Sequence, residues 1–317
     1  MLGFIIRRTL VLIPTLLVTT MIIFGMMQLM PGEPIDIFLS PNVTMTEQEK
    51  ENFREQHGLD DPIYVQYVTW LTDFFQGDMG RSFNYGQPVW DLIKVRIGPT
   101  ALLAGTSLLL ALAVSIVFGT ISAVRQYTML DNVVTGASFF GVSLPDFWFA
   151  LILIFVFPVS LDVLPTSGMN SVKGGGVLDV LRHMILPVIV LSTAQTAILT
   201  RYMRSSVLEV LHEEFVSSAR AKGLGEFAVI VKHVMRNSMM TIVTIVGLSL
   251  PFFLSGALIV EQVFSWPGLG QFFWRSVGQR DYPVIMALLT MTSFLTLLGN
   301  FLADLAYGFL DPRIQYD

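Results

Sequence analysis

Six long, almost uncharged runs constrain this chain more than any other feature of its sequence. The hydrocarbon core of a bilayer is about 30 Å thick, and a helix needs about 20 apolar residues to cross it. With 53% hydrophobic and only 14% charged residues among 317, the chain can supply several such helices. The sequence therefore predicts an all-α integral membrane protein with about six transmembrane helices. The predicted spans are Thr9–Met30, Thr100–Ala123, Val133–Phe157, Met184–Thr200, Thr241–Val260 and Pro283–Phe309.

The beginning of the chain resembles a signal peptide at first inspection. Arg7 and Arg8 precede the first apolar run, as they do in a secretory or twin-arginine signal. That run is too long for a signal and ends in LMPGEP, without small residues at cleavage spacing. We interpret it as a retained transmembrane helix, with a cleaved signal as the alternative.

The distribution of Lys and Arg among the connecting segments predicts the orientation. Basic residues of short loops are retained on the cytoplasmic side of a membrane. Residues 201–240 contain six of them, against two each in residues 158–183 and 261–282. The sequence therefore places residues 201–240 in the cytoplasm and, with six spans, both termini on the same side.

The segment between the first two spans, residues 31–99, is predicted to form a helical cap outside the cell. It has eleven acidic and five basic residues, a net charge of −6. Capping-box residues start one helix over Thr46 to Gln56, and Pro62 and Gly77 bracket a second, aromatic one. The stretch PVWDLIKVRIG predicts a third short helix in the membrane interface. The cap is either a docking platform or a solvated loop that packs on itself.

These features divide the chain into three parts. Residues 1–30 are the N-terminal end and first span, and residues 31–99 are the external cap. Residues 100–317 form a core of five spans with a cytoplasmic loop at 207–237.

The sequence SLPDFW places an ionisable group beside a proline within the third predicted span. If Asp146 lies at mid-span, it is expected to face a polar cavity or a partner, because a carboxylate in contact with lipid is costly. If the span starts later, Asp146 lies near its end. Pro145 and Pro251 each free a backbone carbonyl, and a structural kink is the alternative explanation for both. Pro145, Asp146 and Pro251 are candidates for lining a substrate path.

The sequence contains no arrangement of residues typical of an enzyme. HEEFV begins like the zinc-protease motif H-E-x-x-H, but Val216 stands where the second histidine is required. In LPTSG, Pro165 stands where intramembrane serine proteases have a glycine. Cysteine is absent, which excludes thiolate metal sites and cysteine nucleophiles, and no G-x-x-x-x-G-K-[ST] motif occurs. We expect no catalytic residue, metal site or ATP site in this chain.

Between the fourth and fifth spans, the polar stretch EFVSSARAKGLGEFAVIVKH predicts two helices joined at a glycine. The first begins at about His212 and ends at Gly223, which suits a left-handed conformation. The second covers about Glu226 to Asn237. One face of the first helix is predicted to combine Phe215, Ala219 and Lys222, with small residues allowing close approach of another surface. The helix is either a knob for a soluble partner's groove or an amphipathic helix that rests on lipid.

This stretch resembles the coupling loop of binding-protein-dependent ABC importer permeases. The similarity continues through IVTIVGLSLPFFLSGALIVEQVFSWPGLGQFFWRSVGQRDYPVIMA to LADLAYGFLDPRIQYD, and includes IIRRTLVLIPTLL, MPGEP, GDMGRSFNYGQPV and SLPDFW. These segments are similar to the dipeptide/oligopeptide subfamily, to the first of its two paired permeases. The resemblance implies that the following residues couple to ATPase subunits: Glu214, Phe215, Ser218, Ala219, Arg220, Lys222 and Gly223. Ser218 departs from the alanine of the family pattern.

The resemblance also implies partners and a cargo. The expected partners are a second permease, two cytoplasmic ATPases that hydrolyse ATP, and an external substrate-binding lipoprotein, with no cofactor bound by this chain and no nucleic acid. The cargo would be a di- or oligopeptide, with nickel or glutathione as alternatives. The expected location is a bacterial or archaeal cell membrane. The aromatic residues expected to dock the binding protein, or else to form an interfacial belt, are Phe264, Trp266, Phe272 and Trp274.

A secondary transporter is the other class of transport protein to consider. Such a protein usually has ion-coupling acids in several spans, whereas Asp146 and Asp304 are the candidates here.

Overall fold

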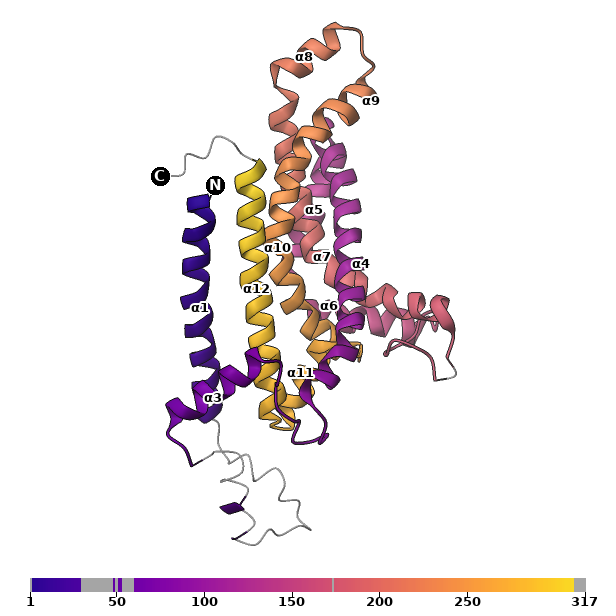
Figure 1. The fold of residues 1–317 in the computed structure, drawn as a ribbon. Helices are drawn as coiled ribbons and strands as arrows, with labels where there is room; N and C mark the ends of the chain where they lie inside the picture. Colours follow the sequence, from indigo (N-terminus) through magenta and orange to yellow (C-terminus); the bar gives the residue numbers. More distant parts are fainter. Residues whose placement is uncertain (1, 30–47, 49–50, 53–59, 173, 311–317) are drawn as a thin grey trace. The chain divides into compact units, whose positions relative to one another are not determined.

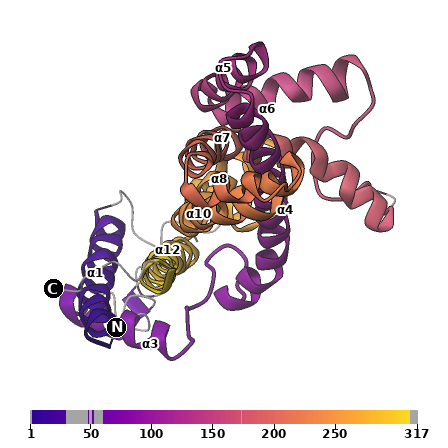
Figure 2. The same ribbon diagram turned by 90° about the horizontal axis from the view of Figure 1, so that it is seen from above.

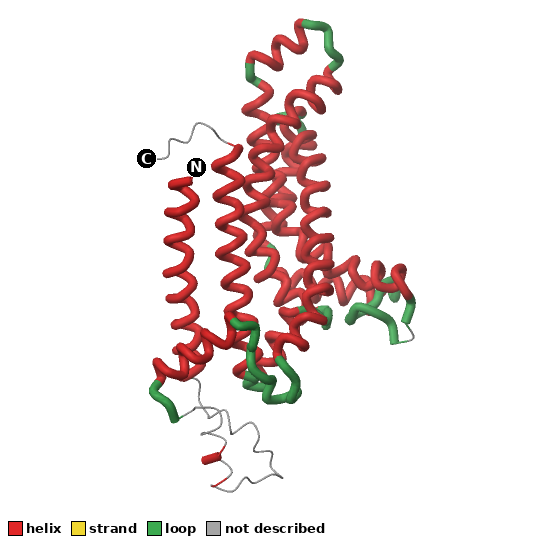
Figure 3. Tube along the Cα trace, viewed as in Figure 1, coloured by secondary structure: helices red, strands yellow, loops and turns green. Residues whose placement is uncertain are grey.

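The computed structural model describes residues 2–29, 48, 51–52, 60–172 and 174–310. Within these ranges the chain forms helices joined by turns and loops, with one isolated bridge between Arg81 and Pro88 (Figure 3). The all-α prediction is confirmed. The elements, shown in Figure 1, are α1 (Leu2–Gln28), α3 (Ile63–Phe75), α4 (Val89–Val124), α5 (Met129–Ser143), α6 (Asp146–Ile154), η2 (Phe155–Ser160), α7 (Gly176–Leu211), α8 (Glu214–Ala221), α9 (Glu226–Ala228), η3 (Val229–Met235), α10 (Arg236–Val263), α11 (Leu269–Gly278) and α12 (Tyr282–Leu310).

The chain divides into two compact units, which are described one at a time. Unit 1 comprises residues 1–99 and 268–298, and unit 2 comprises residues 100–267 and 299–317. The three-part division predicted from the sequence, with boundaries at residues 30 and 99, stays a prediction.

Unit 1 contains a short helix, α3, that contacts α1 through aromatic side chains. Tyr67 of α3 lies edge-on to Phe24 of α1, with ring centroids 5.5 Å apart, and its hydroxyl is 2.9 Å from the hydroxyl of Thr20. The α3 helix follows Pro62, and Gly77 adopts a φ of +92° beyond its end, as the sequence predicts. The helix predicted over Thr46 to Gln56 lies almost entirely outside the described residues.

The predicted interfacial helix PVWDLIKVRIG is not a separate element. It forms the first turns of α4, which continues through Pro99 to Val124. The apolar side of these turns packs against other residues of unit 1. Val89 and Ile93 are fully buried there in a cluster with Phe272 and Val284. The prediction of a distinct helix was wrong because the amphipathic pattern reflects packing against protein, which sequence periodicity cannot distinguish from packing against lipid.

The third predicted span is broken in its middle. Helices α5 and α6 meet at an angle of 102°, and Leu144 between them is extended, with φ −80° and ψ 123°. Proline disfavours helical geometry in the residue before it, so Pro145 explains the extended Leu144. Asp146 is consequently the first residue of a new helix, and the predicted span Val133–Phe157 consists of parts of two helices bent at Pro145, a bend that the proline indicated.

Unit 2 has α7 at its centre. Leu191 and Val190 of α7 are buried with Ala150 of α6 and Val260 of α10. Near the other end of α7, Gly119 of α4 is buried so close to it that an added Cβ atom would lie 2.7 Å from the Met203 Cβ atom.

The described helices include five candidate membrane spans, judged by their length and composition. Five are long and apolar enough to cross a bilayer, and the bent pair of α5 with α6 and η2 would make a sixth. The prediction of about six spans agrees with this range.

Candidate functional site

Helix α8 is the short helix that the sequence predicts between two spans. Figures 1 and 2 both show it lying over the ends of α7 and α10. It begins after Glu213, whose extended ψ of 146° turns the chain into the helix, and Glu214 places negative charge in the first turn. The predicted start near His212 is therefore correct to within two residues.

Gly223 ends α8 as predicted. Its φ is +79°, the left-handed region that glycine adopts without steric cost. The Gly223 N–H donates to the Arg220 carbonyl at 2.9 Å, and the Leu224 N–H donates to the Ala219 carbonyl at 3.4 Å. These two bonds make a Schellman motif, which satisfies carbonyls that the helix end would otherwise leave without a partner.

One face of α8 is anchored in the core of unit 2. Val216 is fully buried and Ala219 is 5% exposed, in a cluster with Met203 and Val207 of α7 and Ile242 of α10. The sequence grouped Ala219 with Phe215 and Lys222, but the structure places Ala219 on the buried side. Its small side chain therefore permits close approach of α8 to its own chain.

The face of α8 adjacent to this buried side is exposed. Phe215, Ser218 and Lys222 are all accessible and follow one another at helical spacing. The Phe215 side chain is 41% exposed on a helix whose other apolar residues, Val216 and Ala219, contact the core. Phe227, just after the glycine turn, is 81% exposed on the same loop.

An ion pair links α8 to the helix that follows. The Arg220 guanidinium donates to both carboxylate oxygens of Glu226, from Nη2 at 2.7 Å and from Nε at 3.1 Å. This bidentate contact raises the pKa of Arg220 above its ordinary value. Sequence reasoning identified Arg220 but not Glu226, because the partner lies beyond the turn. The second helix continues through η3 into α10, so its predicted end at Asn237 was wrong.

The candidate path residues lie at the break between α5 and α6. Pro145 precedes α6, and Asp146 begins it in a half-buried position. Pro145 also lines a shallow apolar hollow of about 310 Å³ with Leu144, Phe147 and Trp148. Pro251 lies within α10, and its side chain is not among those that the structure describes. The path assignment stays a prediction.

The four candidate docking aromatics occupy different environments. Phe264 is 2% exposed and Trp266 is fully buried in the core of unit 2, whereas Phe272 is 2% exposed in the core of unit 1. Trp274 is 56% exposed. Among these four, only the Trp274 side chain is available to another protein, so the docking prediction is narrowed to it.

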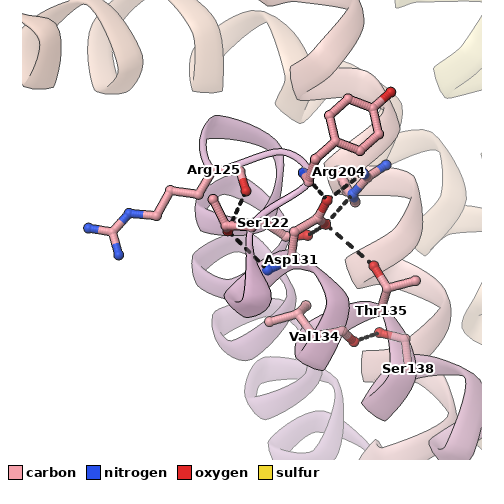
Figure 4. Close-up of polar contacts among 9 residues, drawn as sticks. Ser122, Arg125, Asp131, Val134, Thr135, Ser138 and Arg204 are labelled. Carbon is pink, nitrogen blue, oxygen red and sulfur yellow. Dashed lines mark hydrogen bonds and ion pairs between the residues drawn. The ribbon is translucent and has the colours of Figure 1, made fainter.

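Three buried carboxylates were missed by the sequence reasoning. Asp131, Glu261 and Asp281 are each at most 3% exposed. They lie at or near helix ends, where an acid is ordinarily solvated and gives no signal of burial. Asp131 binds Arg204 of α7 (Figure 4). Among the described residues, no group of three or more His, Asp or Glu is placed to hold a metal ion.

Comparison with known proteins supports a transport role. The chain matches the model of the binding-protein-dependent transport system inner membrane component over residues 115–316, and the model of the N-terminal part of such membrane components over residues 1–104.

Curated relatives match along the whole chain. It is 45% identical over 318 residues to the oligopeptide transport system permease protein AppB of Bacillus subtilis (strain 168), covering all of both chains. It is 35% identical to the dipeptide transport system permease protein DppB of Escherichia coli (strain K12), covering all of this chain and 99% of the relative.

A solved structure confirms the fold. The MetNI methionine ABC transporter, in inward-facing conformations, aligns with a TM-score of 0.54 and 15% identity, over 69% of this chain and 96% of the solved chain. At this identity the likeness concerns the fold alone. With both family models matched and relatives aligned end to end, the chain belongs to the family of binding-protein-dependent transport system inner membrane components.

Proposed function

We propose that this chain is the permease subunit of an ATP-driven importer of di- and oligopeptides, and that α8 is the element to which ATPase subunits bind. The partners would be a second permease, two cytoplasmic ATPases and an external substrate-binding lipoprotein. The α8 end would face the cytoplasm of a bacterium, together with both termini. ATP would be hydrolysed by the partner subunits, and this chain would supply the path and no chemistry.

One observation carries the proposal for α8. The helix is bound to the core by Val216 and Ala219 while it presents Phe215, Ser218 and Lys222 outward. A helix resting only on lipid would need its apolar residues on one outer face, whereas α8 uses its small and branched residues to contact α7 and α10. A partner that moves α8 would therefore move the spans to which it is packed.

The driving force for such a movement must come from the partners. A conformational change requires a difference in binding free energy between the two states. ATP bound between ATPase subunits would favour one position of α8, and an external binding protein would favour one state of the path. The permease would then open alternately to the two sides of the membrane.

Peptide cargo is supported by the relatives, which include oligopeptide, dipeptide and di/tripeptide permeases. Nickel and glutathione importers are less favoured because none of these matched relatives is named for such a cargo. Binding of radiolabelled tetra-alanine, nickel ion and glutathione to the external binding protein that co-purifies with this chain tests the assignment. Preferential binding of nickel or glutathione would overturn it.

The docking role is tested with Phe215→Ala in the assembled transporter. Truncation of a central aromatic anchor commonly costs about 2 kcal/mol or more of binding free energy. We expect less ATPase to co-purify and tetra-alanine uptake to fall. Phe140→Ala is the matched control, because Phe140 is 65% exposed on α5 and lies outside the proposed interface. Unchanged ATPase recovery and uptake in Phe215→Ala would refute the docking role.

A further inference from the structure

An ion pair between a buried aspartate and a partly buried arginine joins α5 to α7 in unit 2. Arg204 Nε donates to Asp131 Oδ1 at 2.8 Å, and Arg204 Nη2 donates to Asp131 Oδ2 at 2.9 Å. The side chains are 4% exposed for Asp131 and 25% exposed for Arg204. A bidentate contact of this kind fixes the orientation of both side chains as well as their distance.

The same carboxylate also binds the end of α4 and the turn that follows it. Ser122 Oγ donates to Oδ1, and the Tyr127 backbone N–H donates to Oδ2 at 2.9 Å. Tyr127 adopts a φ of +63°, an uncommon conformation for a residue with a side chain, and its N–H is bound by Asp131 in that conformation. Figure 4 shows Ser122, Asp131 and Arg204 converging from three helices. Asp131 therefore connects α4, α5 and α7 at one point.

This point lies on the part of α7 that supports α8. Met203 and Val207, which flank Arg204 in sequence, are fully buried in the same cluster as Val216 and Ala219 of α8. Ala123, next to Ser122, belongs to that cluster too.

Stability alone does not explain an ionic group here. Desolvation of two charges offsets much of their attraction, and apolar residues of similar volume stabilise a buried site at least as well. An ion pair adds directional bonds, which favour one relative position of the helices over a slight shift along their apolar surfaces.

We propose that Asp131 and Arg204 are positioning residues for energy coupling. They hold α5 and the α8-bearing part of α7 as one rigid body, so that a displacement of α8 moves α5 and the broken span together with α7. This inference rests on the proposed role of α8. Without the ion pair, α8 and α7 still move, but α5 does not follow them over the full distance. The path then opens incompletely.

The test uses the complete transporter in proteoliposomes and measures radiolabelled tetra-alanine transported per ATP hydrolysed. Asp131→Asn and Arg204→Lys are expected to lower this ratio at least about fivefold, the lower end of typical coupling between distant sites. Hydrolysis of ATP itself continues, because no residue of the ATPases is changed. An unchanged ratio in both variants would overturn the proposal.

A double variant separates positioning from stability. Asp131→Asn combined with Arg204→Gln leaves no unpaired buried charge, so assembly and thermal stability should return toward those of the parent. The transport ratio should stay low, because glutamine is shorter than arginine and an amide pair lacks the charge-assisted double hydrogen bond. Recovery of the ratio together with stability would show a structural role only and would refute the proposal.

Arg201→Gln is the matched control. Arg201 lies one turn before Arg204 and also contacts α5, with its guanidinium 4.8 Å from the centre of the Phe139 ring, but both groups are exposed. Exposed contacts of this kind contribute little, so the ratio should be that of the parent. A loss as large as that of Asp131→Asn would show that any α5–α7 contact suffices, against the proposal.

A direct measurement of the rigid body is also possible because the chain has no cysteine. Spin labels on cysteines at Ser217 of α8 and Val133 of α5, both exposed, report the distance between the two helices. In the parent transporter, the distance should be the same with and without ATP. In Asp131→Asn, the distribution of distances between the two labels should become broader when ATP binds. A distance that already changes in the parent would refute the proposal, and this readout serves even where transport is too low to measure.

The outcomes also separate this inference from the proposed function. If Phe215→Ala abolishes ATPase binding while Asp131→Asn transports normally per ATP, only the positioning role fails. If Phe215→Ala has no effect on ATPase binding, the role of α8 fails.

Discussion

The two units each contain a buried aspartate, and the two are satisfied in different ways. In unit 2, Asp131 binds an arginine 73 residues away on another span, together with a hydroxyl and a backbone N–H. In unit 1, Asp281 accepts hydrogen bonds from residues 82–84: from the Ser82 hydroxyl, from the backbone N–H groups of Phe83 and Asn84, and from the Asn84 side-chain amide.

The difference indicates different tasks. Asp281 anchors the loop at residues 82–84 to the beginning of α12, much as an anion is held by a series of backbone N–H groups, and all of these donors are neutral. Asp131 instead uses a full charge pair, and its partner Arg204 lies within another long helix. A loop closure affects the loop, whereas a link between spans affects how the spans move together.

Loss of Arg204 should have the largest effect in this comparison. Arg204→Met leaves the Asp131 carboxylate buried without its cation, and removal of one partner of a buried pair typically costs about 3 to 5 kcal/mol. We expect a clear decrease in the thermal unfolding temperature of the detergent-solubilised transporter. An unfolding temperature within experimental error of that of the parent would show that the Asp131–Arg204 pair does not hold α5 and α7 together.

Gly119→Ala tests the helix crossing next to the same link. The new methyl group would lie 2.7 Å from the Met203 Cβ atom and 2.8 Å from the Thr200 carbonyl oxygen, both on α7. Overpacking of this kind typically costs about 1 to 3 kcal/mol, because backbone atoms cannot move aside cheaply. Gly105→Ala is the control on the same helix, since nothing lies within 4 Å of its Cβ position. Equal unfolding temperatures for the two variants would contradict close contact of α4 and α7.

Asp281→Asn should produce a local effect in unit 1. The asparagine amide cannot accept the bonds that one carboxylate oxygen accepts, and an unsatisfied buried group costs about 1 to 3 kcal/mol. Hydrogen exchange at the amides of Phe83 and Asn84 should accelerate, with exchange in α7 and transport per ATP unchanged. Equal acceleration in α7 would remove the distinction between loop closure and a link between spans.

The spans and the α8 turn were predictable from the sequence because their causes are local. Apolar length defines a span, and a glycine after a polar helix defines the turn at Gly223. The break before Asp146 could be predicted in part. Pro145 indicated its position, but the angle between α5 and α6 depends on how α6 packs against α7 and α10. The burial of Ala219 was not predicted, because helical spacing gives the angle between side chains and does not say where the buried part of the helix surface ends.

The link between Asp131 and Arg204 could not be predicted. Each residue taken alone looks like an ordinary charge at the end of an apolar run, and only the packing of α5 against α7 brings them together. The burial of Phe264, Trp266 and Phe272 could not be predicted for a related reason: aromatic residues of a short loop have the same sequence pattern in an exposed aromatic belt and in a core.

Gly223→Ala should have the smallest effect, confined to the α8 turn. Its φ of +79° lies in the left-handed region, where a residue with a Cβ atom is disfavoured by about 1 to 2 kcal/mol, and nothing lies within 4 Å of the added methyl group. The strain is therefore conformational and independent of packing. Gly225→Ala is the control, because Gly225 has a φ of −63° and also has open space at its Cβ position. Gly223→Ala should weaken recovery of ATPase subunits slightly relative to Gly225→Ala, while thermal unfolding of the spans is unchanged. If both variants recover ATPases equally, the conformation of the turn does not determine the position of α8, which the buried contacts of Val216 and Ala219 and the ion pair of Arg220 with Glu226 must then hold.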